Sequence, residues 1–213
     1  MHIEWYGQSA FRIEAGGRTV AIDPFGDMSG AAARGMQFDY PPITGLTADL
    51  LLITHEHGDH NAAEVVGGDP TVYRSTAGTV DDMVGVASEH DAVAGTQRGA
   101  NVMYALELGG LRVAHLGDLG QAALRPEQVT ALGRVDLLFV PVGGGPTIGA
   151  DLAFEIAGML GARWVVPMHY RTERVNFLEP ADAFLAHFDT VTRVDSAFEL
   201  DGLPEGAVVP AAP

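Results

Sequence analysis

Three imidazoles and two carboxylates stand within six residues of this chain, in the stretch THEHGDH from Thr54 to His60. Side chains of these types packed so densely would repel and desolvate one another unless a cation held them together. The apolar run Leu50–Ile53 directly before them predicts a buried strand, and Gly58 disfavours a helix at this point. We therefore expect metal ligands on a loop at the carboxyl end of a strand, the usual place for sites in layered α/β folds. The alternative, an exposed polar turn, is disfavoured because histidine is scarce in this chain and recurs in similar contexts further on.

The pattern H-x-H-x-D-H after an apolar strand resembles the signature of the metallo-β-lactamase superfamily, and residues 54–60 match it in full. The resemblance implies a four-layer α/β fold, an αββα sandwich of two mixed β-sheets flanked by helices, with a two-metal hydrolytic site. The chain itself has two successive β-rich halves, each closed by helices, and no linker that would divide domains. We expect one domain over residues 1–213, with a Pro- and Ala-rich tail, 201–213, that is poorly ordered.

The ends of three later strands carry the remaining ligands that the resemblance implies. His90-Asp91, followed by Arg98-Gly99-Ala100-Asn101, is similar to a segment of the small lactonase-like members of the superfamily. His90 would give a catalytic zinc ion its third nitrogen ligand. Asp118 follows a strand in the Gly-Asp context of the family's bridging aspartate, and its two oxygens could span metals about 3.5–4 Å apart. His169 ends the segment WVVPMH and resembles the family's last ligand.

The resemblance thus implies two metal sites that share one carboxylate. The first is formed by His55, His57, His90 and Asp118, and the second by Asp59, His60, Asp118 and His169. Two divalent ions are the expected cofactors, zinc first, although nitrogen and oxygen ligands also suit manganese, iron and nickel. A hydroxide formed at such a binuclear site near neutral pH is the expected nucleophile. Asp59 and Asp118 are the expected catalytic residues, with Asp59 or the bridging water passing a proton to the leaving group.

Other polar residues stay open between a functional and a structural role. Asp23, at a strand end, either supports the site from behind, as the resemblance implies, or caps the next turn. Arg98 either orients substrate or pairs with a site carboxylate, and we favour the pair. Tyr170 and Arg171 either contact substrate or lie on the surface. The parity of His115 in its strand places it on the face opposite the bridging aspartate, so we expect it to be structural.

Two loops could border the site. Residues 25–47, rich in glycine and proline, are too long for an ordinary connection and predict a functional loop or lid. The apolar residues of this loop could line a pocket or pack it against the body; they are Phe25, Met28, Met36, Phe38 and Tyr40. The glycine-rich stretch 141–147 either offers backbone N–H groups to an oxyanion or is a turn that passes close beneath the site.

The elements that must position these residues follow from periodicity and turn residues. Residues 2–14 and 19–23 predict two strands joined by a glycine turn. Further strands are expected over 71–75, 102–108, 111–116, 136–140, 164–170 and 191–200. Helices are expected over 61–66, 126–132, 151–160 and 180–187, while 77–86 stays ambiguous. In the helix over 151–160, Leu152, Ile156 and Met159 are expected to face inward.

Composition restricts the partners and the compartment. With 12 arginines, no lysine and a formal net charge of −16, we expect no nucleic-acid partner, because phosphate neutralisation dominates such binding. An anionic small-molecule substrate stays open, since bound metal and a few arginines supply local positive charge. No apolar run is long enough to cross a membrane, and the N-terminus lacks the layout of a signal peptide. We expect a cytoplasmic protein without a membrane partner; homo-oligomerisation stays open.

Together these features and the resemblance predict a metal-dependent hydrolase, and the resemblance implies that it cleaves an ester-type bond. A lactone or a phosphorylated small molecule is the leading substrate, because the pattern resembles ascorbate-6-phosphate lactonase-like enzymes. A small-molecule phosphodiesterase is the alternative within the same chemistry. An iron-binding redox or sensor protein is the alternative outside it, because this ligand set also holds iron. A chain with a degenerate site that serves only interaction is least expected, since every ligand position is filled.

Overall fold

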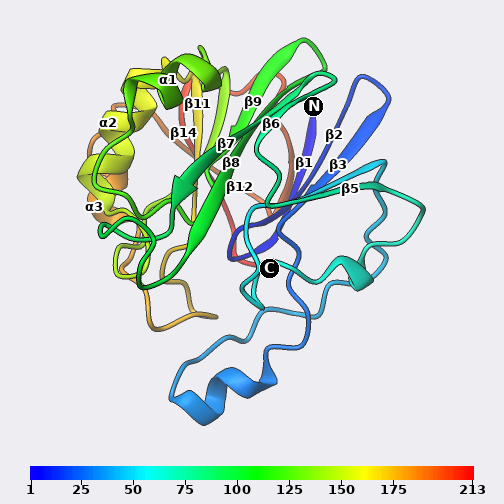
Figure 1. Ribbon diagram of the computed structural model, residues 1–213, viewed down its shortest axis with the longest axis vertical. Coiled ribbons are helices and arrows are strands. Elements are labelled where there is room, and N and C mark those ends of the chain that lie inside the picture. Colours follow the sequence, from blue (N-terminus) through cyan, green and yellow to red (C-terminus); the bar gives the residue numbers. More distant parts are fainter.

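Two mixed β-sheets pack face to face in the computed structural model, which describes residues 1–213 (Figure 1). Three helices cover the outer face of one sheet: α1 (Pro126–Leu132), α2 (Ala150–Leu160) and α3 (Asp182–Leu185). The other outer face is covered by residues 25–48, which include the 3₁₀ helix η1 (Ser29–Arg34). A second 3₁₀ helix, η2 (Ala63–Val65), replaces the predicted helix over 61–66. The predicted sandwich is confirmed, with a loop instead of α-helices in one outer layer.

The first sheet has six strands: β1 (His2–Gly7), β2 (Ala10–Ala15), β3 (Arg18–Ile22), β4 (Leu50–Ile53), β5 (Thr71–Arg74) and β13 (Ala197–Glu199). Their order in space is β13-β1-β2-β3-β4-β5. The pairs β3–β4 and β4–β5 are parallel, and the other neighbours are antiparallel. All four residues of β4 are buried, because the sheet is covered on both faces there.

The predicted first strand, residues 2–14, is two strands. The chain reverses at Gln8 and Ser9, where Gln8 has a φ of 51°, and β1 pairs antiparallel with β2. Apolar side chains alternate on both sides of this turn and face the same core, so the periodicity does not reveal where the chain reverses. The turn directs the Gln8 side chain toward the loop after β4, where it contacts Asp59.

The second sheet has eight strands: β6 (Gly78–Val80), β7 (Met83–Glu89), β8 (Ala100–Leu108), β9 (Leu111–His115), β10 (Leu137–Pro141), β11 (Trp164–Met168), β12 (Val191–Val194) and β14 (Gly206–Pro210). Their order is β12-β14-β11-β10-β9-β8-β7-β6. The ambiguous stretch 77–86 contains β6 and the start of β7, which pair as a hairpin. The strand predicted over 191–200 is divided between the two sheets, with β12 in this one and β13 in the other.

The C-terminal tail is ordered, against the prediction. β14 lies between β11 and β12 and pairs parallel with both. Val208 is fully buried, and Ala207 is 1% exposed. The prolines before and after this short apolar run led to the prediction of disorder. Pro210 is the last residue of β14, however, so its missing N–H group does not interrupt the hydrogen bonds within the sheet.

The inner face of α2 also differs from the expected one. Ala153, Ile156, Ala157 and Leu160 are buried, whereas Met159 is 53% exposed. Small alanines let the helix approach the sheet closely, so the buried stripe passes through them rather than through the largest apolar side chains. The longest helix has 11 residues, and no helix combines the length and hydrophobicity that a bilayer crossing requires.

The burial of β14 makes a testable prediction about the tail. Val208→Ala should lower the free energy of unfolding by about 2 kcal/mol, because it removes buried methyl groups from between two packed layers. Val191→Ala is the control, since Val191 is 38% exposed on the edge strand β12. Urea unfolding of both variants measures the difference. Equal, negligible losses in the two variants would show that the tail does not belong to the folded core.

Candidate metal centre

Seven side chains converge at one edge of the sandwich, where strands of both sheets end. They are His55, His57, Asp59, His60, His90, Asp118 and His169. The loop after β4 supplies four of them, and the chain just after β7, β9 and β11 supplies one each. The structure therefore brings together all the residues that the sequence predicts as ligands.

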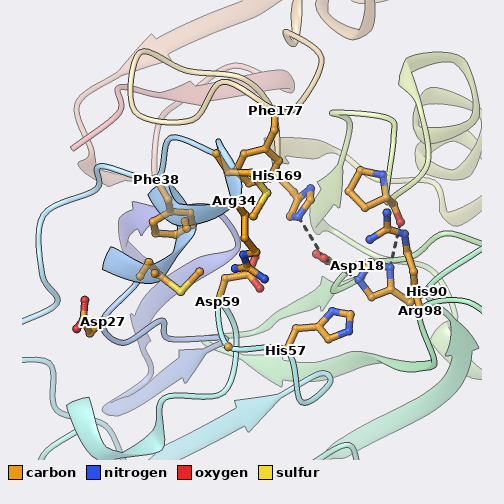
Figure 2. A pocket seen from close by; sticks show the side chains of 16 residues that line it. Asp27, Arg34, Phe38, His57, Asp59, His90, Arg98, Asp118, His169 and Phe177 are labelled. Atoms are coloured by element: carbon orange, nitrogen blue, oxygen red, sulfur yellow. Dashed lines mark hydrogen bonds and ion pairs between the residues drawn. The ribbon is translucent and has the colours of Figure 1, made fainter.

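Within this cluster, two groups of three residues could each hold a metal ion. They are His55, His57 and His90, and Asp59, His60 and His169. Asp118 lies between them: its Oδ2 is 3.1 Å from Nε2 of His90, 3.1 Å from Nε2 of His169 and 3.3 Å from Nε2 of His60. Figure 2 shows the Asp118 carboxylate between His90 and His169. This geometry suits a carboxylate that bridges two ions.

The donor set fits divalent cations on two observations. First, Nε2 of His60 and Oδ1 of Asp118 are buried and have no hydrogen-bond partner, although an unpaired buried polar atom costs about 1–3 kcal/mol. Second, Nε2 of His55 lies 3.1 Å from Nδ1 of His57. Zinc–nitrogen bonds of about 2.0–2.1 Å in a tetrahedron separate two ligand nitrogens by about 3.3 Å. Cations held by the two groups would therefore explain both the orphaned atoms and the close approach.

The carboxylates of the cluster must be balanced by positive charge. Burial alone would raise the pKa of Asp118, but His169 and His60 hold it well below its usual value. Burial would lower the pKa of His60, yet the Asp118 and Asp59 carboxylates raise it well above its usual value. Burial and the neighbouring His60 lower the pKa of His55 to about 3, so this ring stays neutral. The carboxylates are ionised, and either a protonated imidazole or a metal ion must balance them.

A layer of hydrogen bonds behind the cluster fixes the orientation of three rings. Nδ1 of His90 lies 3.0 Å from the carbonyl oxygen of Pro146, and Nδ1 of His55 lies 3.0 Å from Oγ1 of Thr54. Nδ1 of His60 is 3.0 Å from Oδ2 of Asp23. In each case an Nδ1–H donor leaves the Nε2 lone pair facing the cluster, which is how second partners orient metal-binding histidines.

Asp23 connects the hydrogen bonds behind His55 with those behind His60. Its carboxylate accepts hydrogen bonds from the backbone N–H and the hydroxyl of Thr54, at 2.8 and 2.7 Å, besides its contact with His60. The residue is fully buried and has a φ of 47°, a strained conformation of the kind that clusters at functional sites. Of the two roles left open for Asp23, the structure shows the supporting one.

Two further residues hold Asp118, and the sequence analysis assigned neither of them a role. The Asn101 side chain accepts from the Asp118 backbone N–H and donates to Ser88 and to the Leu116 carbonyl. Gly117 has a φ of 56°, and a Cβ there would lie 2.3 Å from Oδ1 of Asn101. Only glycine fits this turn. The sequence motifs include both the Gly-Asp pair and Asn101. The contact between them could not be predicted, because it forms only when the strands pair.

Gln8 is a third residue that sequence reasoning missed. Its Nε2 donates to Oδ2 of Asp59 at 3.0 Å, and the residue is fully buried while its Oε1 has no partner. It reaches the cluster only because the chain reverses between β1 and β2. Since the sequence predicts an unbroken strand there, nothing marked this glutamine.

Several candidates lie elsewhere. Glu56 points away from the cluster and pairs with Arg74. His115 is buried beneath the site and bonds to Ser9 and Gly117, so the predicted structural role is confirmed. Tyr170 is neither on the surface nor in the pocket: it is buried and stacks on Trp5 with ring centroids 5.8 Å apart.

The two arginines also differ from the favoured expectations. Arg98 lines the pocket but makes no ion pair, so the predicted pairing with a site carboxylate is wrong. Arg171 donates through Nε to the Leu178 carbonyl and does not line the pocket. The glycine-rich turn passes close beneath the site, since a Cβ at Gly143 would lie 2.2 Å from the His169 carbonyl oxygen.

A cavity of about 540 Å³ opens above the cluster (Figure 2). The predicted lid segment forms one wall with Met28, Arg34, Met36 and Phe38. Phe25 and Tyr40 instead pack against Phe38 within the covering layer. The segment therefore both borders the pocket and packs on the body, the two roles that the sequence left open.

Comparison with known proteins agrees with this geometry. A family model described as a beta-lactamase superfamily domain matches residues 2–169. A UPF0173 protein of Pyrococcus abyssi is 33% identical over 196 residues, covering 81% of this chain and 84% of the relative. A UPF0173 metal-dependent hydrolase of Geobacillus thermodenitrificans is 31% identical, with 81% and 86% covered. A crystal structure from Thermotoga maritima, described as a candidate Zn-dependent hydrolase of the metallo-β-lactamase superfamily, has 37% identity and a TM-score of 0.78, covering 98% of this chain and 97% of that one.

The hydrogen bonds behind the cluster generate a prediction about metal affinity. Thr54→Val keeps the shape of the side chain but removes the hydroxyl between Asp23 and His55, so the affinity for Zn²⁺ should fall about 10- to 100-fold. Thr54→Ser should restore it. Competition with a chelator of known affinity measures the change. Thr130→Val is the control, because Thr130 is exposed on α1 and bonds only to the Pro126 carbonyl. Unchanged affinity in Thr54→Val would show that the hydroxyl does not position the ligands.

Proposed function

This chain belongs to the metallo-β-lactamase superfamily and, within it, to the UPF0173 metal-dependent hydrolases, and on that premise we propose that it cleaves an ester-type bond of a small molecule with two bound divalent ions. The observation that carries the proposal is the Asp118 carboxylate, which lies between two complete groups of ligands. His55, His57 and His90 would hold one ion, Asp59, His60 and His169 the other, and Asp118 both. Zinc is the metal we propose, because three nitrogen ligands and a free position are typical of catalytic zinc sites.

The bound ions would lower the pKa of a water between them toward neutrality and polarise the oxygen of the bond to be cleaved. The protein's own part is to hold seven ligands in a fixed, largely dry arrangement. Asp118 and His60 are almost completely buried, so these groups do not need to reorganise during the reaction. The strained backbone at His169, with a φ of 50°, belongs to the same rigid arrangement.

Asp59 is the residue we assign to proton transfer. Its side chain is 21% exposed and lines the cavity, whereas that of Asp118 is 3% exposed and enclosed by imidazoles. The Gln8 amide donates to Oδ2 of Asp59, which leaves Oδ1 available to a leaving group. A positioned carboxylate of this kind accelerates proton transfer about 10²- to 10⁴-fold.

The cavity supports a small-molecule substrate. Its volume of about 540 Å³ falls within the range of about 300–1,000 Å³ of small-molecule sites. The wall combines apolar side chains of the lid segment with charged groups of the metal centre. A lactone or a phosphorylated small molecule is therefore the substrate we propose, and a phosphodiester is the nearest alternative.

The assignment of Asp59 can be tested on zinc-loaded protein with a panel of lactones and activated esters. Asp59→Asn should lower kcat at least about 100-fold, and the loss should grow as the leaving group becomes more basic, because such groups depend most on a proton donor. Glu56→Gln is the matched control, since Glu56 lies in the same loop but pairs with Arg74 outside the cluster.

Metal content, measured on each sample, separates a lost ion from a lost proton transfer. A loss in Asp59→Asn that is equal for all leaving groups, at full metal content, would overturn the proton-transfer role. Absence of hydrolysis by fully loaded wild-type protein across lactones, esters and phosphodiesters would contradict the proposed function itself.

A further inference from the structure

Two arginines from separate segments face the cavity above the metal centre. Arg34 is the last residue of η1, and Arg98 belongs to the loop between β7 and β8. Both line the same cavity as His57 and Asp59. In Figure 2 the two side chains lie on either side of the Asp118 carboxylate. Any molecule bound over the cluster would therefore have a guanidinium group on each flank.

Neither guanidinium is used within the protein. Six of the 12 arginines form ion pairs with carboxylates, namely Arg12, Arg18, Arg74, Arg112, Arg125 and Arg163. Arg171 and Arg174 donate to backbone carbonyls. Four arginines make no side-chain hydrogen bond or ion pair: Arg134 and Arg193, which do not line the cavity, and Arg34 and Arg98, which do. Asp27, the remaining acidic residue of the wall, accepts from the Ser29 N–H instead. Both cations are thus free for a ligand.

The loop that carries Arg98 is held rigidly. The Asp91 carboxylate accepts four backbone hydrogen bonds, of 2.8 to 2.9 Å, from Val93, Gly95, Gln97 and Arg98 itself. The residue is 8% exposed and directly follows the ligand His90. This internal scaffold fixes the backbone of Arg98 relative to the metal centre, so only the Arg98 side chain itself must be ordered when a ligand binds.

Arg34 is also carried by an anchored segment. Gly35 ends η1 in the left-handed conformation with a φ of 73°, and its N–H bonds to the Ala32 carbonyl. Just beyond it, the Gln37 backbone donates to Asn176 and the Gln37 side chain to the Glu173 carbonyl. The lid segment is therefore tied to the chain after β11, close to the point where His169 enters the site.

We propose that Arg34 and Arg98 together bind an oxyanion, a carboxylate or phosphate group, that the substrate carries away from the bond being cleaved. This inference rests on the proposed function and narrows its substrate class to small anionic esters. Arginine forms paired hydrogen bonds with such groups and keeps its charge at all working pH values. In a chain with a net charge of −16, the bound metals and these two arginines would make the cavity locally positive and attractive to anions.

Equilibrium binding to zinc-loaded protein tests the assignment without turnover. The probes are 3-phosphonopropionate and propylphosphonate, which share a phosphonate for the metals and differ by a distal carboxylate. Titration calorimetry on the wild type should show the first binding about 10- to 100-fold more tightly, as expected for a charge-assisted pair. Arg34→Ala and Arg98→Ala should each remove most of this preference, and should weaken propylphosphonate binding by a clearly smaller factor than 3-phosphonopropionate binding. Arg18→Ala is the control, because Arg18 pairs with Asp82 outside the cavity.

The results distinguish failure of anion binding by Arg34 and Arg98 from failure of metal binding. Equal affinity of the wild type for both probes, at full metal content, would overturn the arginine assignment and leave the metal centre intact. A preference that survives in both arginine variants would overturn it as well. Protein that takes up no zinc would overturn the metal centre and this inference together. Arg98→Lys gives a further check, since a lone ammonium should recover only part of the preference.

Discussion

A buried carboxylate surrounded by imidazole nitrogens is the constraint on which the rest of this structure depends. Oδ2 of Asp118 lies within 3.3 Å of three histidine rings, and its other oxygen has no partner. Burying ionised and polar groups in this way is unfavourable unless each finds a charge or a hydrogen bond. Bound metal ions would satisfy this arrangement, because they would take the lone pairs of Asp118 and His60 that the protein leaves unpaired. The stability of the folded state and the occupancy of the candidate metal centre are therefore coupled.

The fold brings these side chains together because strands of both sheets end at the same edge of the sandwich. Regular strands deliver His55, His90, Asp118 and His169 to this edge, and the final adjustments are made in the turns. Strained or glycine-only conformations follow: Asp23 and His169 have positive φ values, and Gly117 is packed against Asn101. Such conformations persist only where the surroundings over-determine them. Asp23 shows how, because one carboxylate orients Thr54 and His60 together.

The sequence was sufficient to predict most strands from local pattern, and its resemblance to a known family, carried by one dense motif and three strand ends, implied the sandwich and all seven clustered residues. It failed where the outcome depends on contacts between distant segments. The turn at Gln8 interrupts an unbroken alternation, and the tail strand β14 is stabilised by pairing with β11 and β12 rather than by its own composition. Tyr170 and Arg98 show the same limit at the level of single side chains. Their positions after a strand or in a loop were known, but the sequence does not determine which side faces the pocket and which the core.

The claim that Asp118 joins two metal ions can be tested most directly by anomalous X-ray diffraction from crystals of zinc-loaded protein, recorded at the zinc absorption edge. We predict two anomalous peaks on either side of Asp118, about 3.5–4 Å apart, one beside His55, His57 and His90 and the other beside Asp59, His60 and His169. A single peak away from Asp118, or no peak in the cluster after loading with excess zinc, would contradict the account.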